Sequence, residues 1–200
     1  MTPSFADRLD DLQRQRQSNL ALYFAPHLAQ LPLVIQKYDD PFFPFTKTII
    51  AATRDLVCAY VFDLAAYLAI GAAGAVALER SMAYASGDAL TILHGPLVGT
   101  GYTALLDKGG FAADAVTLWQ RQDLAAYTTQ ADTSAFLVQP GMPQPAGNEV
   151  IGVYWQAAGI FTLPAKLQQL QIRVVEKAIL DTARGEDFTE QVRVQVERLR

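Results

Sequence analysis

This sequence is poor in the side chains from which most metal sites and covalent catalytic sites are built. Of its 200 residues, one is cysteine, two are histidine, and charged residues make up only 18%. A single cysteine excludes an intrachain disulfide framework, and two separated histidines without a carboxylate at ligand spacing argue against a zinc site. We therefore expect no metal site, and an inert core thiol at Cys58, which lies in an apolar run.

Positive charge is also scarce, and it is not clustered. Sixteen lysines and arginines stand against twenty acidic residues, a balance that argues against a nucleic-acid partner. The first ten residues carry Asp7 and Asp10 but no apolar core, so we expect no secretory signal and a cytoplasmic protein. Residues 56–78 contain one charge, at Asp63, but their β-rich start and alanine-rich remainder fit a buried strand and helix better than a membrane span.

Apolar, strand-like runs alternate with helical patterns along most of the chain. The sequence predicts strands at 20–24, 56–62, 89–94, 114–119, 135–139 and 150–155. It predicts helices at 4–17, 46–54, 63–85, 102–110, 121–131, 164–183 and 186–200. This alternation indicates a parallel sheet covered by helices.

We expect a single domain, residues 1–200, with the α/β architecture of a TIM-type barrel. Six predicted strands are fewer than the eight of a complete barrel, which typically needs about 250 residues. The barrel is therefore shortened, left open as a sheet, or completed by a partner.

Residues 90–101 form a predicted buried strand that runs into a loop, which is where an α/β barrel keeps its chemistry. The segment contains no Asp, Glu, Lys or Arg. Its histidine, His94, is either an acid, base or ligand contact, or a structural residue that bonds the backbone and fills space. The glycines and threonines of residues 99–103 precede a predicted helix and can bind an anion through backbone N–H groups.

Several segments together resemble orotidine 5′-phosphate decarboxylase. They are Asp55–Tyr60, Ala66–Gly71 with Gly74, Ala77–Glu79, Ile92–Leu93, Asp114–Leu118 and Gly185–Phe188. The resemblance covers most of residues 5–120 and 172–200. It implies a homodimeric barrel, often fused or partnered with orotate phosphoribosyltransferase, that decarboxylates a pyrimidine nucleotide without a cofactor. Alternating Asp and Lys side chains in a dry pocket perform that reaction electrostatically.

This chain departs from the family at the charged positions. The family motif Leu-Asp-x-Lys-x-x-Asp places its first Asp at His94, its Lys at Pro96 and its second Asp at Gly99. The family's Asp after the first strand corresponds to Ala25, and its Lys after the second corresponds to Val61. Because proline has no proton to donate, the resemblance implies a degenerate site with no catalytic residues and without the family's reaction.

A pocket altered in this way could still hold a ligand. Residues 140–144 are weakly similar to the family's phosphate loop, and its phosphate-binding Arg falls near Lys177. The predicted ligand-binding residues are His94, Tyr102, Thr103, Gln139 and Lys177.

Three functions stay open at this point. The leading hypothesis is a non-catalytic barrel that acts as a structural, assembly or regulatory module, with orotate phosphoribosyltransferase in pyrimidine biosynthesis as its most concrete partner. The second is a repurposed pocket that binds or transforms a small phosphorylated ligand. The third is residual decarboxylase activity. None of the three involves a nucleic acid or a membrane.

Overall fold

The computed structural model describes residues 3–97, 99–129, 132–137, 160–162, 171–175, 180 and 184–200. The first half of the chain contains α1 (Phe5–Arg16), β1 (Leu20–Phe24), η1 (Leu28–Gln30), α2 (Phe42–Thr53), β2 (Ala59–Asp63), α3 (Leu64–Leu68), α4 (Ala72–Ala85) and β3 (Leu90–Leu97). The second half contains η2 (Thr103–Leu106), β4 (Ala115–Leu118), η3 (Arg121–Asp123), α5 (Leu124–Tyr127), β5 (Ser134–Leu137), β6 (Ile160–Thr162), β7 (Gln171–Val175) and α7 (Phe188–Leu199).

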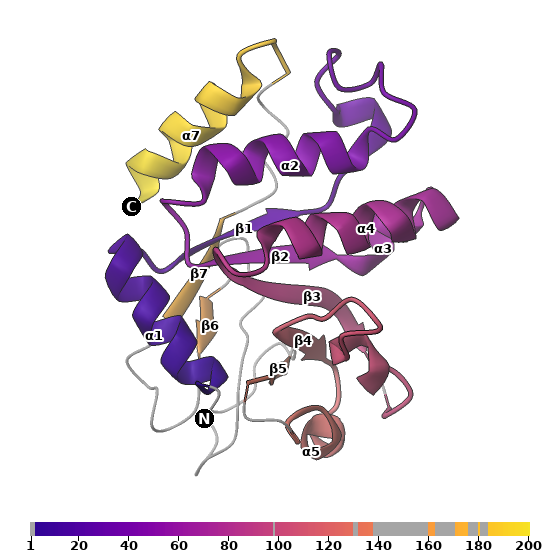
Figure 1. Cartoon of the computed structure of the whole chain (residues 1–200), viewed down its shortest axis with the longest axis vertical. Helices are drawn as coiled ribbons and strands as arrows, with labels where there is room; N and C mark the ends of the chain where they lie inside the picture. Colours follow the sequence, from indigo (N-terminus) through magenta and orange to yellow (C-terminus); the bar gives the residue numbers. More distant parts are fainter. Residues whose placement is uncertain are drawn as a thin grey trace.

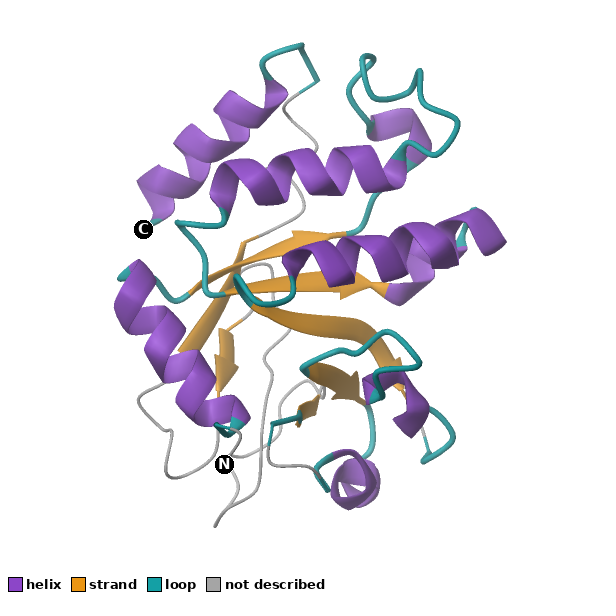
Figure 2. Ribbon diagram, viewed as in Figure 1, coloured by secondary structure: helices purple, strands orange, loops and turns teal. Residues whose placement is uncertain are grey.

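The strands form one sheet in the order β5-β4-β3-β2-β1-β7-β6. β6 is antiparallel to β7, and the other neighbouring strands are parallel. The six parallel strands make an α/β half-barrel, an incomplete barrel of the TIM type. This confirms the predicted fold class. Figure 1 shows the strands crossing the middle of the molecule, and Figure 2 shows α2, α4 and α7 on one side of them.

The two faces of the sheet bury different partners. On the outer face, Leu22 and Phe62 share a core cluster with residues of α2, α4 and α7. On the inner face, Ala21, Val61 and Ile92 belong to a second cluster that includes Phe5 and Leu9 of α1. Side chains alternate between faces along a strand, so burial of both faces explains why the strands read as continuous apolar runs.

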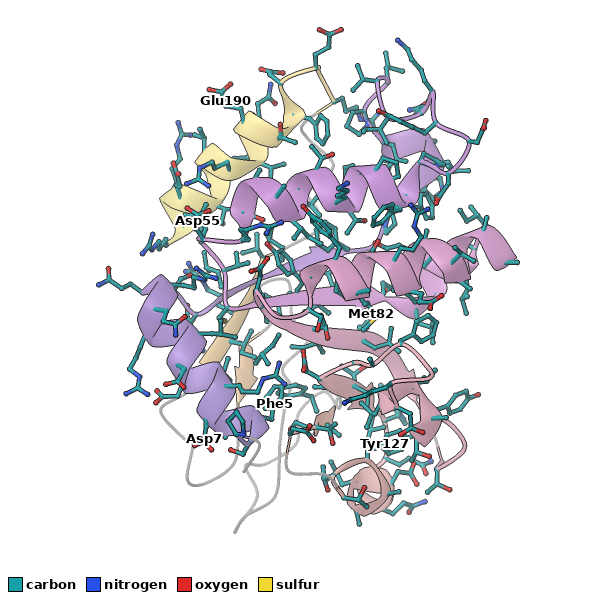
Figure 3. The ribbon with its side chains drawn as sticks, in the orientation of Figure 1. Phe5, Asp7, Asp55, Met82, Tyr127 and Glu190 are labelled. Atoms are coloured by element: carbon teal, nitrogen blue, oxygen red, sulfur yellow. The ribbon has the colours of Figure 1, made fainter. Side chains whose placement is uncertain are left out.

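Helix α1 is held against the amino-terminal ends of the strands. Ser4 caps the helix in a reciprocal pair with Asp7, and Phe5 at its start packs edge-on against Phe136 of β5, with ring centroids 5.9 Å apart (Figure 3). Arg8 donates to the Asp114 carboxylate over 2.5 Å. α1 therefore covers the amino-terminal half of the inner face.

Helix α7 is fixed on the outer side by α2 and the segment after it. The Arg193 guanidinium donates to both carboxylate oxygens of Asp55 at 2.8 Å, and this pairing lowers the pKa of Asp55. The rings of Phe45 and Phe188 stack with centroids 6.1 Å apart.

Three predicted helices are shorter or divided, and one of them, 121–131, is η3 followed by α5. The stretch 63–85 is two helices, α3 and α4, because Gly71 adopts φ 72°, a conformation that favours glycine. A Cβ on Gly74 would lie 1.7 Å from the Tyr67 carbonyl oxygen, so glycine also permits the close approach of the two helices. The predicted helix 102–110 is a single 3-10 turn, Thr103–Leu106, in the structure.

The prediction of a helix throughout 164–183 is wrong at residues 171–175. These residues form β7, parallel to β1, with Leu20 opposite Arg173 and Ala21 opposite Val174. Ile172 and Val174 are buried in the inner cluster, so pairing and burial decide the structure of this β-branched segment. Strand β6 was not predicted, and the predicted strand 150–155 lies outside the described residues.

Candidate functional site

Four polar side chains meet on the inner face at the carboxyl ends of neighbouring strands. They are Tyr23 of β1, Asp63 of β2, His94 of β3 and Thr117 of β4. Each follows an inner-cluster residue by two positions, the period of a strand; those residues are Ala21, Val61, Ile92 and Ala115. We call these four side chains the inner-face cluster.

The cluster is joined by hydrogen bonds across the strands. The Tyr23 hydroxyl donates to Asp63 Oδ2, and the Ala66 N–H donates to Asp63 Oδ1 over 2.8 Å, which caps α3. Thr117 Oγ1 shares a 3.1 Å hydrogen bond with His94 Nδ1. Asp63 and His94 lie opposite each other in the β2–β3 register, so the two bonded pairs are adjacent.

Burial sets the protonation of the two rings. Burial lowers the pKa of His94, which is 8% exposed, and the nearby Asp63 carboxylate only partly opposes this. Burial, reinforced by the bond to Asp63, raises the pKa of Tyr23. At neutral pH the cluster therefore combines a neutral imidazole, a protonated phenol and one carboxylate. Such groups can hold or exchange protons, but they supply no positive charge.

The structure shows the surroundings of several positions that match the family's charged residues. Val61 is fully buried on the inner face, and His94 lies beyond it on the same face. Ala25 lines a cavity of about 10 Å³ with Gln30 and Phe45 among its walls, which is room for about one water molecule. The backbone of Pro96 continues β3.

Gly99 is held by hydrogen bonds to η3 and α5. Its N–H donates to Asp123 Oδ2 over 2.6 Å, and its carbonyl accepts from the Tyr127 hydroxyl over 2.8 Å; Tyr127 lies on α5 (Figure 3). The Gly99 N–H, one of the donors that could bind an anion, thus already donates to the Asp123 carboxylate. This finding counts against the anion site expected at residues 99–103.

Two of the remaining predicted ligand residues, Tyr102 and Thr103, are described and are not members of the inner-face cluster. Tyr102 is 49% exposed, and Thr103 lines an open groove of about 460 Å³ with Asp107 and Thr133 among its walls. Gln139 and Lys177 lie outside the described residues. Of the three predicted residues that the structure describes, His94 belongs to the cluster and Tyr102 and Thr103 do not.

Sequence reasoning missed three members of the cluster. Tyr23 and Thr117 lie within predicted strands, and Asp63 directly follows one. The sequence alone does not show which face of the sheet each side chain occupies, because that depends on how the strands pair. A period of two from the matched position Val61 would have indicated Asp63. Thr117 carried no comparable signal, because a threonine in an apolar strand is common.

The structure also bears on metals and membranes. Among the residues it describes, no three His, Cys, Asp or Glu side chains are grouped so that they could hold a metal ion. No helix in the same part of the chain is long and apolar enough to cross a membrane. Cys58 is fully buried, and burial raises its pKa to about 12, which confirms the expected inert thiol.

A parallel half-barrel with polar groups at the carboxyl ends of its strands is the architecture of TIM-type enzymes. The sequence comparisons are more specific. The chain is 43% identical over 78 residues to orotidine 5′-phosphate decarboxylase of Thermomicrobium roseum, covering 39% of this chain and 28% of that protein. It is 30% identical over 141 residues to the enzyme of the same name from Herpetosiphon aurantiacus, covering 67% and 52%.

Solved structures show the same fold. The fold matches a Toxoplasma gondii structure assigned to orotidine-monophosphate decarboxylase with a TM-score of 0.59 and 25% identity, covering 67% of this chain and 48% of that one. UMP synthase of Leishmania donovani matches in fold with a TM-score of 0.56 at 20% identity, covering 68% and 30%. No family model matches the chain.

The chain belongs to the orotidine 5′-phosphate decarboxylase family. This confirms the resemblance. The chain spans 28% and 52% of the length of the two curated relatives.

Proposed function

We propose that this chain is a non-catalytic member of the family that binds a small phosphorylated ligand at the carboxyl ends of β1–β4. One observation carries the proposal. Where the resemblance expects an Asp and Lys array, the inner face presents Val61 and a cluster of Tyr23, Asp63, His94 and Thr117. Polar groups that converge at the carboxyl ends of parallel strands are typical of a binding site.

The same observation argues against the family's chemistry. Losing carbon dioxide from a ring leaves a carbanion, which needs a nearby cation or acid in the transition state. Among the described inner-face residues of β1–β5, none is a lysine or an arginine. His94 is held neutral by burial, so the cluster lacks the preorganised positive charge.

Ligand binding can be tested by thermal shift with orotidine 5′-phosphate, uridine 5′-phosphate and sugar phosphates. A ligand at 100 times its dissociation constant stabilises the folded state by about 2.7 kcal/mol. We expect at least one of them to raise the melting temperature, and the rise to shrink in His94→Ala. The matched control is His27→Ala, because His27 is exposed on the loop after β1. No shift with any ligand would contradict the proposal.

Catalytic loss can be tested by direct assay of orotidine 5′-phosphate turnover. We expect no decarboxylation above that of a buffer blank. Turnover that disappears in Asp63→Asn or His94→Ala would instead establish residual lyase activity by a new set of residues.

A second function, assembly, is favoured by apolar exposure on the segment between β1 and α2. Leu33 is 71% exposed, Tyr38 56% and Leu28 46%, and such apolar groups mark interaction surfaces. The partner would be a second copy of this chain, as in the homodimers that the resemblance implies, or orotate phosphoribosyltransferase. Light scattering of the protein alone and mixed with that enzyme tests this function, and a monomer in both samples would exclude it.

A further inference from the structure

The inner-face cluster carries negative charge that its own contacts do not cancel. Asp63 receives hydrogen bonds from two neutral donors, the Tyr23 hydroxyl and the Ala66 N–H. No ion pair among the described residues includes Asp63. Neutral donors disperse the charge of a carboxylate without neutralising it.

The surroundings of Asp63 offer no compensating cation within the described part of the sheet. His94 lies opposite Asp63 in register and is buried as a neutral ring. Val61, two residues before Asp63, is apolar and fully buried. Among the described residues, the inner face at the carboxyl ends of β1–β4 therefore presents one carboxylate, that of Asp63, in a partly buried position, where charge is screened less than in water.

We propose that Asp63 makes this site select ligands with an uncharged polar ring and reject ligands that carry a carboxylate on that ring. The inference rests on the ligand binding proposed above and specifies its chemistry. A neutral ring can donate an N–H or O–H to the free lone pairs of Asp63. A carboxylate at the same place brings two negative charges together in a partly buried site, which disfavours binding.

Two probe nucleotides differ by the group in question. Orotidine 5′-phosphate carries a ring carboxylate, and uridine 5′-phosphate is the same molecule with hydrogen in its place. Titration calorimetry on the full chain would measure both dissociation constants. We expect uridine 5′-phosphate to bind at least tenfold more tightly, a ratio equivalent to about 1.4 kcal/mol.

Two variants move this ratio in opposite directions. Asp63→Asn removes the charge and keeps a side chain that can cap α3, so the preference should fall to within about threefold. Tyr23→Phe removes the hydroxyl that disperses the charge on Asp63, so the preference should grow. Glu79→Gln, on the exposed face of α4, makes the same change in net charge as Asp63→Asn at a distance and should leave the ratio unchanged. Unfolding curves of all three establish that they fold.

The possible outcomes separate this inference from the proposed function. Tight binding of uridine 5′-phosphate with a ratio that collapses only in Asp63→Asn supports it. Equal or tighter binding of orotidine 5′-phosphate by the unmodified chain overturns the charge selection and leaves the binding function standing. A preference that survives in Asp63→Asn also overturns it. Absence of binding by either nucleotide at millimolar concentration overturns the inference, and the binding function falls with it only if the sugar phosphates also give no thermal shift.

Discussion

The two faces of the sheet treat their buried polar groups differently. On the outer side of the sheet, Tyr60 of β2 shares a 3.0 Å hydrogen bond with Thr53 of α2. Tyr67 of α3 shares a 2.6 Å hydrogen bond with Thr46 of the same helix, α2. On the inner face, Tyr23 donates instead to a carboxylate. Neutral partners satisfy a hydroxyl without leaving a charge, whereas Asp63 keeps its charge at the carboxyl ends of the strands. The outer face therefore consists of packing and neutral hydrogen bonds, and the proposed ligand site lies on the inner face.

The comparison predicts its largest effect for the outer core. Phe62 is fully buried and stacks on Phe24, with ring centroids 5.5 Å apart. Phe62→Ala should cost about 3–5 kcal/mol through lost burial and a cavity, measured by urea denaturation. A cost below 1 kcal/mol would show that the outer face is not the main source of stability.

The next effect concerns α1, which covers the amino-terminal half of the inner face. The Asp114 carboxylate accepts from Arg8 and, over 2.8 Å, from the Thr91 N–H, and it is largely buried. Arg8→Ala should cost about 1.5–3 kcal/mol, because a hydrogen bond to a buried charged group is lost. Arg14→Ala breaks exposed pairs with Asp10 and Asp11 and should cost under about 1 kcal/mol. Equal losses in urea denaturation would contradict this distinction.

A smaller effect on stability is expected from removing a single tyrosine hydroxyl on either face of the sheet. Tyr60→Phe removes a fully buried hydroxyl whose partner Thr53 keeps its bond to the Ile49 carbonyl, so we expect a loss of about 1 kcal/mol. Tyr23→Phe removes a hydroxyl from a half-buried site, and the loss of stability should be less. If Tyr23→Phe destabilises more than Tyr60→Phe, the inner-face cluster is a structural network rather than a binding surface.

The smallest effect is a pH dependence that originates on the inner face. Burial lowers the pKa of His94 in the folded state, so the unfolded chain binds the proton more readily. The resulting destabilisation is absent above the ordinary histidine pKa of about 6.5, and it grows as pH falls below that value. His94→Asn should reduce the loss of melting temperature between pH 7.5 and pH 5. His27→Asn, at the exposed histidine, should keep that loss, and equal behaviour of the two variants would contradict the assignment.

Residues 20–24 show what could be predicted from the sequence. Their five apolar residues form a strand with the expected bounds, because a strand buried on both faces needs no partner information to be recognised. Residues 171–175 show the limit. Their strand exists through pairing with β1, a contact 150 residues away along the chain that local pattern does not encode.

The inner-face cluster was predictable only in part for the same reason. His94 stood out as an unusual residue type in a charge-free segment. Tyr23 and Asp63 became neighbours only through the β1–β2 pairing, which sets Tyr23 opposite Val61 and Phe24 opposite Phe62. Tertiary register therefore decides which ordinary residues become a site.

The burial of Val61 has a consequence for charge at the position that the resemblance matches to the family's lysine. A lysine at this fully enclosed position would have its ammonium desolvated, which favours the uncharged amine. The lysine could stay charged if Asp63 turned from Tyr23 to pair with it, which would leave the phenol without its acceptor. Because a lysine introduced here would take the carboxylate from Tyr23, the single substitution Val61→Lys should destabilise the fold unless neighbouring positions change with it.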